Sequence, residues 1–247
     1  MKQTPFIYGI RPAIEAIKAG KELEKVLLQN GLKGEGFREL FALIKELEIP
    51  FQFVPAEKLN RLSHQNHQGV IAHLSEITYQ KLEQIIPMIY EQGKTPLVLI
   101  LDKVTDVRNL GSIARTAECA GVDALIVPAK GSAQINSDAV KTSAGALYKL
   151  PVVRSENLKE SLRFLHDSGL HIVAATEKAD SDYTAADYSV PTALILGSEG
   201  TGISEEYLKL SDTKVSIPVL GEIESLNVSV ASGILLYEVI RQRKIKS

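Results

Sequence analysis

The segment from residue 221 to residue 241 begins with polar side chains and continues as an apolar helix pattern. Its first turns contain Ser225, Asn227, Ser229 and Ser232. Hydroxyl and amide groups accept hydrogen bonds from the free N–H groups at the start of a helix, but one such residue is enough for a cap. Four of them predict a helix start that also faces a polar ligand.

Two other stretches combine glycines with short polar side chains, namely "DKVTDVRNLGSIAR" at 102–115 and "GSEGTGIS" at 197–204. Each follows an apolar run typical of a strand that is buried on both faces. Ligands of open parallel sheets bind at the carboxyl ends of the strands, so we expect these stretches to meet "VLGEIESLN" at 219–227 in one site. The fingerprints G-x-G-x-x-G and G-x-x-x-x-G-K-[ST] are absent, which argues against NAD-type and P-loop sites.

The elements that must position these loops form two α/β patterns. Residues 1–75 alternate short apolar runs with helical patterns, which predicts a small α/β/α domain. Residues 76–95 contain a short amphipathic helix before Pro96, which we interpret as a linker. Residues 96–247 are predicted to form a parallel-sheet domain. Its expected strands lie at 97–101, 124–128, 171–176, 192–197 and 214–218, and its expected helices at roughly 110–120, 137–146, 156–168, 204–210 and 227–241.

Composition places the chain among globular proteins, with 247 residues, 45% hydrophobic and 23% charged. The net charge of −2 means that any site for a polyanion must be a local patch. No run approaches the roughly 18–20 apolar residues of a membrane span, and the N-terminus lacks a signal-peptide core, so we expect a cytoplasmic protein. The single cysteine, Cys119, excludes an internal disulfide, and its small-residue surroundings favour burial over reactivity.

Taken together, the three loops resemble those of the SpoU-type 2′-O-methyltransferases of the SPOUT class. The first family motif is Asn-x-Gly-x-x-x-Arg, and the second combines glycines with a small polar residue and a glutamate. The third is Ile-Pro followed by Ser-Leu-Asn-Val-Ser. The matching residues are Asn109, Gly111 and Arg115, then Gly197, Ser198, Glu199 and Gly200, then Ile217, Pro218 and the run from Ser225 to Ser229. Val107 departs from the pattern because the family usually has proline there, a change expected to soften the turn before Asn109.

The N-terminal domain is similar to that of family members which modify ribosomal RNA. The similarity lies in "YGIRPAIEAI" at 8–17 and "HQGV" at 67–70. In those proteins this segment is a small RNA-binding domain like those of ribosomal proteins. The chain as a whole is closest to the large-subunit ribosomal RNA guanosine 2′-O-methyltransferases.

The resemblance implies transfer of a methyl group from S-adenosylmethionine to a ribose 2′-hydroxyl of RNA, with a guanosine of 23S ribosomal RNA as the expected target. It also implies a deep trefoil knot, a bent cofactor within it and a homodimer, in which we expect the helix 227–241 to take part. No metal, DNA or membrane is expected. Two alternatives are a transfer-RNA 2′-O-methyltransferase of the same family and a catalytically silent RNA-binding assembly protein.

The resemblance also assigns roles to individual residues. Arg115 is expected to bind phosphate and stabilise the developing alkoxide, because a guanidinium stays protonated and is a poor base. Asn109 is a catalytic candidate that could instead be only a helix cap, and Glu199 is expected to accept hydrogen bonds or pair with Arg115. The remaining catalytic candidates are Ser225 and Asn227. The expected cofactor-binding residues are Thr176, Leu196, Gly197, Gly200, Ile217, Leu226 and Ser229.

Two further patterns remain open. The tail "RQRKIKS" at 241–247 contains four cations, which either complement the helix dipole or contact RNA. His64 and His67 are three residues apart, but no cysteine or carboxylate lies at ligand spacing, so a metal site is not expected.

Overall fold

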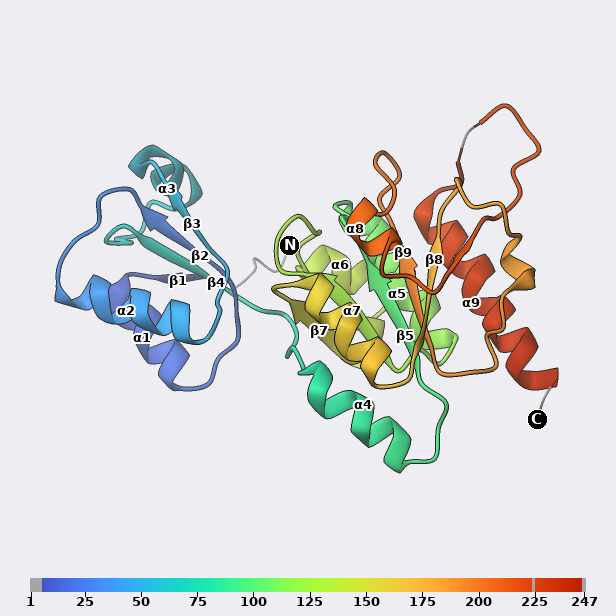
Figure 1. Cartoon of the computed structure of the whole chain (residues 1–247). Coiled ribbons are helices and arrows are strands. Elements are labelled where there is room, and N and C mark those ends of the chain that lie inside the picture. Colours follow the sequence, from blue (N-terminus) through green and yellow to red (C-terminus); the bar gives the residue numbers. More distant parts are fainter. Residues whose placement is uncertain (1–5, 224, 246–247) are drawn as a thin grey trace. The chain divides into compact units, whose positions relative to one another are not determined.

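The computed structural model describes residues 6–223 and 225–245, which form two compact units (Figure 1). The first unit comprises the described residues up to Thr78 together with Ile135–Ser137, and the second comprises Tyr79–Gln134 and the described residues from Asp138 onward. The predicted bounds 1–75, 76–95 and 96–247 remain a prediction.

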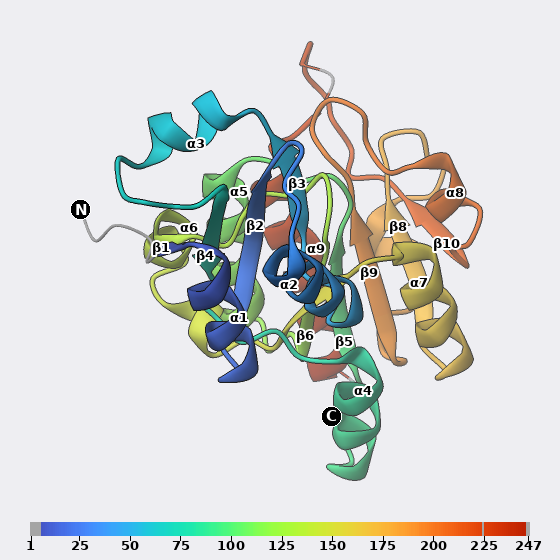
Figure 2. The same ribbon diagram turned by 90° about the vertical axis from the view of Figure 1, so that its left-hand side faces the viewer.

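The first unit is a four-stranded sheet with helices on both faces. Its strands are ordered β1-β4-β2-β3, and β2 and β3 are parallel while the other pairs are antiparallel. The apolar side chains of α1 and α2 pack on one face of the sheet, and Leu59 of α3 packs on the other (Figure 2). The α/β/α prediction for this part of the chain is therefore confirmed. The elements are β1 (Phe6–Tyr8), α1 (Ile10–Lys18), β2 (Leu23–Gln29), α2 (Glu35–Glu46), β3 (Phe51–Val54), α3 (Ala56–Leu62) and β4 (Val70–Leu74).

The second unit contains a six-stranded sheet in which every pair is parallel, with the order β10-β8-β9-β5-β6-β7. The predicted parallel sheet is confirmed. Its elements are α4 (Leu82–Glu91), β5 (Leu97–Leu101), α5 (Val107–Cys119), β6 (Ala124–Pro128), α6 (Ser137–Thr142), η1 (Ala146–Tyr148), β7 (Val152–Ser155), α7 (Leu158–Asp167), β8 (His171–Ala175), η2 (Tyr183–Ala185), β9 (Thr192–Leu196), α8 (Glu205–Leu208), β10 (Thr213–Val215) and α9 (Val228–Ile245).

Helices cover both faces of this sheet, as the continuous apolar strands require. The two central strands β5 and β9 are buried at every position. The apolar sides of α4, α7 and α8 share one core cluster with the strands. The helices α5 and α9 pack against each other on the opposite face (Figures 1 and 2).

The strand β7 was not predicted. It lies at the edge of the sheet, and its sequence, "VVRS", contains only two apolar residues after Pro151. A short strand with an arginine in the middle lacks the apolar run that identifies the inner strands. The expected helix 137–146 is also shorter, because α6 ends at Thr142 and a 3₁₀ turn follows.

The segment predicted as a linker includes a helix that belongs to the second core. Leu82, Ile85, Ile86 and Ile89 of α4 are all buried against the sheet of the second unit. The helix therefore contributes to the stability of this unit rather than only connecting two domains.

Among the described residues, no helix combines the length and the hydropathy needed to cross a membrane. The trefoil knot remains a prediction.

Candidate functional site

A pocket of about 210 Å³ opens at the carboxyl ends of β8, β9 and β10. This is the place where a parallel sheet presents its loops to a ligand. The lining residues are Ala175, Thr176, Glu177, Leu196, Gly197, Ser198, Glu199, Gly200, Gly202, Val215, Ile217, Val219, Ser225, Leu226, Val228 and Ala231.

The loop 197–202 forms one wall of the pocket and is folded tightly on itself. The backbone N–H of Gly202 donates to the carbonyl of Ser198 at 2.9 Å. A Cβ atom on Gly197 would lie 2.1 Å from the carbonyl carbon of Gly202, so only glycine is accommodated there. A Cβ atom on Gly200 would meet no atom within 4 Å. The fold of the loop thus requires glycine at position 197, whereas Gly200 leaves open space beside the pocket.

The end of this loop is held by residues that the sequence did not single out. The buried carboxylate of Asp102 accepts a hydrogen bond from the backbone N–H of Ser204 at 2.7 Å. The ammonium of Lys103 donates to the Ser204 hydroxyl at 2.9 Å, and Lys103 has a φ of 57°. A non-glycine residue in that region costs conformational energy. These two residues after β5 therefore fix the loop after β9.

Asp106 is the cap of α5, because its carboxylate accepts from the backbone N–H groups of Arg108 and Asn109 at 2.7 and 3.0 Å. The alternative in which Asn109 is only the cap is therefore wrong. Val107 is the first residue of the helix rather than part of a loop before Asn109. Proline is favoured at that position, and valine is accommodated there without loss of a side-chain bond.

The side chains of Asn109, Glu199 and Asn227 form a hydrogen-bond network. Glu199 Oε1 accepts from Asn109 Nδ2 at 3.0 Å, from Asn227 Nδ2 and from the backbone N–H of Val228 at 3.3 Å. Asn227 Nδ2 also donates to Asn109 Oδ1 at 3.1 Å. Three residues that lie far apart in the sequence, one from each motif, are thus joined beside the pocket. The described residues show no bond between Glu199 and Arg115.

The polar start of α9 is explained by two separate tasks. Asn227 Oδ1 accepts from the backbone N–H of Ser229 at 2.9 Å and from its hydroxyl, which caps the helix. Ser225 lines the pocket. Ser232 is fully buried and its hydroxyl has no partner among the described atoms.

Arg115 is exposed and does not line the pocket of its own chain. It follows Asn109 by six residues, which corresponds to about 9 Å along the helix axis and a rotation of about 120° away from Asn109. Among the described residues no bond to the Arg115 guanidinium is found. The structure therefore does not bring Arg115 together with Asn109 and Glu199 within one chain.

Six of the seven expected cofactor-binding residues line the pocket, and Ser229 does not. The residues are Thr176, Leu196, Gly197, Gly200, Ile217 and Leu226. Their roles remain predictions.

The sequence interpretation missed six lining residues, namely Ala175, Glu177, Gly202, Val215, Val219 and Ala231. Glu177 directly follows Thr176 at the end of β8, and this position was the signal available in the sequence. Among the described lining residues, Glu177 and Glu199 are charged and none is basic. Glu199 Oε1 already accepts three hydrogen bonds, whereas no hydrogen bond to the Glu177 carboxylate is found among the described residues. Glu177 is therefore the lining carboxylate with both oxygens open to a cationic ligand.

The expected burial of Cys119 is wrong, because its side chain is exposed. The buried face of α5 contains Leu110, Ile113, Ala114 and Ala117, and Cys119 lies two residues beyond this stripe. Small neighbours alone therefore did not indicate which side of the helix faces the core.

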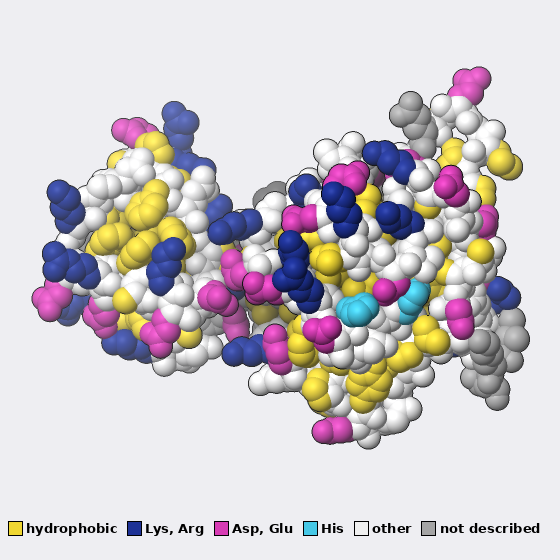
Figure 3. Space-filling model, in the orientation of Figure 1, with side chains coloured by type: hydrophobic (Ala, Val, Ile, Leu, Met, Phe, Trp, Pro, Cys, Tyr) yellow, Lys and Arg dark blue, Asp and Glu magenta, His cyan; other side chains and the backbone are white. Residues whose placement is uncertain are grey.

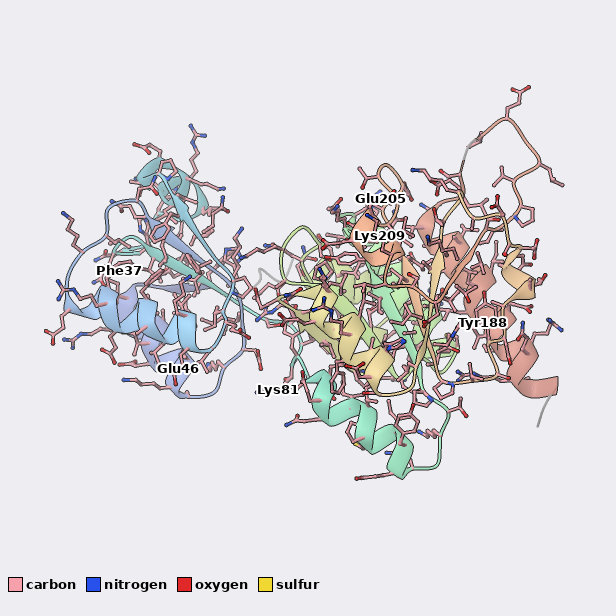
Figure 4. All side chains as sticks on the ribbon, in the orientation of Figure 1. Phe37, Glu46, Lys81, Tyr188, Glu205 and Lys209 are labelled. Carbon is pink, nitrogen blue, oxygen red and sulfur yellow. The ribbon has the colours of Figure 1, made fainter. Side chains whose placement is uncertain are left out.

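Two tail arginines have structural partners. Arg241 donates two 2.7 Å bonds to Glu238, which lower the pKa of this carboxyl. Arg243 donates to the backbone carbonyls of Thr95, Pro96, Tyr188 and Val190, and burial lowers the pKa of its guanidinium. Figure 4 shows Tyr188 beside α9. Lys244 is exposed, and Lys246 lies outside the described residues.

His67 also has partners of its own. Its Nε2 lies 2.9 Å from Asn60 Oδ1, and its Nδ1 accepts from the backbone N–H of Gly69 at 3.0 Å. Both ring nitrogens are engaged, so the histidine holds the turn before β4.

Both parts of the chain match models of known protein families. Residues 96–237 match the model of the SpoU rRNA methylase family, and residues 6–80 match the model for RNA 2′-O ribose methyltransferase substrate binding. The two parts of the chain are thus those of an RNA methyltransferase, a methylase domain and a substrate-binding domain.

Individual proteins of this class are similar to the chain in sequence and structure. A protein of Staphylococcus saprophyticus, named for the TrmH family of tRNA/rRNA methyltransferases, is 36% identical over 237 residues, covering 96% of this chain and 95% of that protein. The SpoU methyltransferase AviRb from Streptomyces viridochromogenes, solved with the cofactor AdoMet, has a TM-score of 0.62 and 27% identity over 98% of this chain and 91% of its own. A TrmH/SpoU tRNA modifying enzyme of A. aeolicus has a TM-score of 0.56 and 32% identity, covering 67% of this chain and 85% of its own.

The chain belongs to the SpoU/TrmH family of RNA methyltransferases. The family recognised from the three motifs is confirmed, and so is S-adenosylmethionine as its cofactor.

Proposed function

We propose that this protein transfers a methyl group from S-adenosylmethionine to a ribose 2′-hydroxyl of ribosomal RNA, with a guanosine of 23S ribosomal RNA as the target. The observation that carries the proposal is the network of Asn109, Glu199 and Asn227 beside the pocket. It joins the three motif loops at one point, as a site with a single reaction centre requires.

The pocket suits S-adenosylmethionine in both shape and charge. Leu196, Val215 and Ile217 provide an apolar wall for an adenine ring, and Gly200 leaves space for close approach of a ligand to the backbone. The cofactor carries a sulfonium and an ammonium group, and Glu177 offers a carboxylate of opposite charge. When bound, the cofactor supplies the electrophilic methyl group.

The side chains of this chain supply alignment and electrostatics. Asn109 and Asn227 hold Glu199 in place, and Ser225 lies at the pocket mouth where the ribose must enter. Displacement at a sulfonium carbon requires the hydroxyl oxygen, the methyl carbon and the sulfur in line, so a fixed pocket wall lowers the barrier through orientation. A donor near the developing alkoxide is still required.

We propose that Arg115 of a second protomer provides this donor. Arg115 is exposed and does not line the pocket of its own chain. Helix α9 presents Val230 and Tyr237, 50% and 54% exposed, seven residues apart on one helix face. An apolar stripe on a helix that already packs against α5 favours a homodimer interface. A guanidinium from the partner would bind the phosphate and the alkoxide together.

Ribosomal RNA is favoured over transfer RNA by the first unit. The match to the substrate-binding model covers residues 6–80. The A. aeolicus tRNA modifying enzyme covers only 67% of this chain, and the part that it leaves uncovered is similar in size to the first unit. A location in the cytoplasm is part of the same proposal.

Two measurements test the proposed function. Calorimetry with S-adenosylmethionine in EDTA should show binding without metal. Mapping of 2′-O-methyl groups in RNA from cells with and without the protein should reveal one site lost from 23S ribosomal RNA. Loss of a 2′-O-methyl site from transfer RNA instead would identify tRNA as the substrate. Cofactor binding without the loss of any 2′-O-methyl site would favour an assembly protein.

A further inference from the structure

Four of the six phenylalanines of the chain form one cluster on the first unit. We call Phe37, Phe41, Phe51 and Phe53 the ring cluster. The first two lie one turn apart on α2 and the last two lie on the same face of β3. Neighbouring ring centroids are 5.3–6.0 Å apart.

The ring cluster is only partly required for the core. Phe37, Phe41 and Phe51 are partly buried and pack on the core between the sheet and α1/α2, whereas Phe53 is 44% exposed. Phe53 lies on β3, which is the edge strand of its sheet. Figure 3 shows the resulting apolar patch on the first unit with Lys and Arg side chains around it, and Figure 4 locates Phe37 there. Contiguous exposed apolar surface of this kind indicates a binding site.

Two cations accompany the rings. The Lys45 ammonium lies 4.7 Å from the Phe51 centroid and 5.5 Å from the Phe41 centroid, within the range of a cation–π contact. Arg38 is exposed on α2, and its spacing of seven residues from Lys45 places both on one side of the helix. Among the described residues neither side chain has an ion pair.

We infer that the ring cluster is a stacking platform for an unpaired nucleotide of the RNA substrate, with Arg38 and Lys45 positioned for its phosphates. Aromatic rings beside basic groups are the combination that binds single-stranded nucleic acid, since every base has a π-face and every linkage a negative charge. A duplex is disfavoured, because its bases are already stacked on each other. The inference rests on the proposed function, since it takes RNA as the partner of this unit.

The absence of tryptophan from the chain allows a direct test on the full-length protein. Phe53→Trp places one indole on the patch, and Leu62→Trp is its control, because Leu62 is 46% exposed on α3, which packs on the opposite face of the same sheet. The probes are a short single-stranded RNA of mixed sequence and the blunt duplex of the same sequence. Saturable quenching by the single strand in Phe53→Trp, but not in Leu62→Trp, supports the platform. Equal quenching by the duplex, or none, overturns it.

Affinity measurements separate stacking from general apolar contact. Phe53→Ala should weaken binding of the single strand about tenfold, the size expected for loss of one stacked base. Phe53→Leu should weaken it almost as much, because leucine preserves the apolar bulk without the π-face. Full retention by Phe53→Leu would overturn the stacking inference, as would dissociation of an oligomer by Phe53→Ala in sedimentation, which would assign the patch to a second copy.

The outcomes also distinguish this inference from the proposed function. Cofactor binding by the Phe53→Ala and Phe53→Leu variants should equal that of the parent, because the pocket lies in the second unit. Circular dichroism spectra equal to that of the parent show that the first unit of these variants is folded. Quenching without methylation of any RNA would refute the proposed function and retain the platform. Methylation of ribosomal RNA with an unchanged KM for RNA in Phe53→Ala would retain the function and refute the platform.

Discussion

Glu199 illustrates how a single acceptor can order a site. Its carboxylate receives two side-chain amides and one backbone N–H, so its position fixes Asn109 on α5 and Asn227 at the start of α9. The role that these contacts support for the glutamate is positioning. Replacement of Glu199 by a neutral side chain of the same size tests this role.

Glu199→Gln should reduce methyl transfer by roughly 100-fold, because the new amide presents N–H groups to donors and misaligns the neighbours of the reacting hydroxyl. Single-turnover methylation at saturating cofactor and RNA is the measurement. Glu205→Gln is the control, since Glu205 is an exposed carboxylate on α8 (Figure 4). A rate for Glu199→Gln within about threefold of the control would show that the network is not needed for the reaction.

The two glycines of the second motif should respond differently to alanine. Gly197→Ala forces Cβ onto the backbone of Gly202 and should cost at least about 1–3 kcal/mol, lowering the melting temperature of the second unit by roughly 2–12 °C. Gly200→Ala should melt within about 2 °C of the parent but bind S-adenosylmethionine about tenfold more weakly, because the cofactor needs the open space. Calorimetry and thermal scans give both values. Unchanged cofactor affinity in Gly200→Ala would place the ligand elsewhere in the pocket.

At the residue scale, the sequence predicted which residues belong to the site better than it predicted what each side chain contacts. The motif letters identified Asn109, Glu199 and Asn227, and the structure joins all three. The alternative that Asn109 is only a cap was wrong, and it arose because Asp106 and Asn109 are three residues apart and both residue types are good caps. Glu177 was missed because a single carboxylate after a strand is common, and only the fold shows that it faces the pocket.

At the scale of elements, the inner strands and the amphipathic helices were predictable because burial on both faces or on one face leaves a clear period. The edge strand β7 and the boundaries of the shorter helices were not, because short elements at an edge depend on their neighbours. The role of α4 was also hidden. Its apolar stripe indicated a helix, but not that the helix packs on the core of the second unit.

The position of α4 leads to a prediction about truncation. A chain lacking residues 1–78 should fold and bind S-adenosylmethionine with near-parental affinity, because it retains α4 and the whole pocket. A chain lacking residues 1–95 removes Leu82, Ile85, Ile86 and Ile89 from the core and should melt at least about 10 °C lower. Both should bind RNA more weakly. Equal melting of the two chains would show that α4 is dispensable.

Arg243 should be essential for the end of α9. Its guanidinium donates to four backbone carbonyls, of which Pro96 and Val190 also accept from Thr192. Arg243→Ala removes the arginine donor from all four, at a cost of about 3 kcal/mol, or roughly 6–12 °C in melting temperature. Lys244→Ala is the matched control, since Lys244 is the exposed neighbouring cation. Calorimetric melting of the two variants tests this. A loss of RNA affinity without a loss of stability in Arg243→Ala would instead assign the tail to RNA contact.

At the scale of the whole molecule, the structure of one chain gives a pocket and the network beside it, but no basic side chain among the described lining residues. Arg115 is exposed and does not line the pocket of its own chain. The proposed dimer, with the partner's Arg115 at the pocket, would remove this disagreement between motif and geometry. The family resemblance predicts a homodimer, but the sequence does not tell which protomer supplies Arg115, because periodicity describes the faces of a helix and not which copy covers them.

Mixed dimers test the shared site. Arg115→Lys should fold and bind cofactor but transfer methyl roughly 100-fold more slowly, because an ammonium lacks the planar donor fork. Glu199→Gln is impaired in its own pocket.

If Arg115 acts across the interface, a mixed dimer combines an intact pocket in the Arg115→Lys chain with an intact arginine from the other chain. Mixing the two inactive proteins in equal amounts with subunit exchange should then restore about a quarter of the parental activity, since half of the dimers are mixed and each has one complete site. If arginine and pocket act within one chain, every site in the mixture retains one defect. Methylation that stays at the level of the separate variants, with exchange verified by tagged subunits, would place Arg115 in its own chain's site.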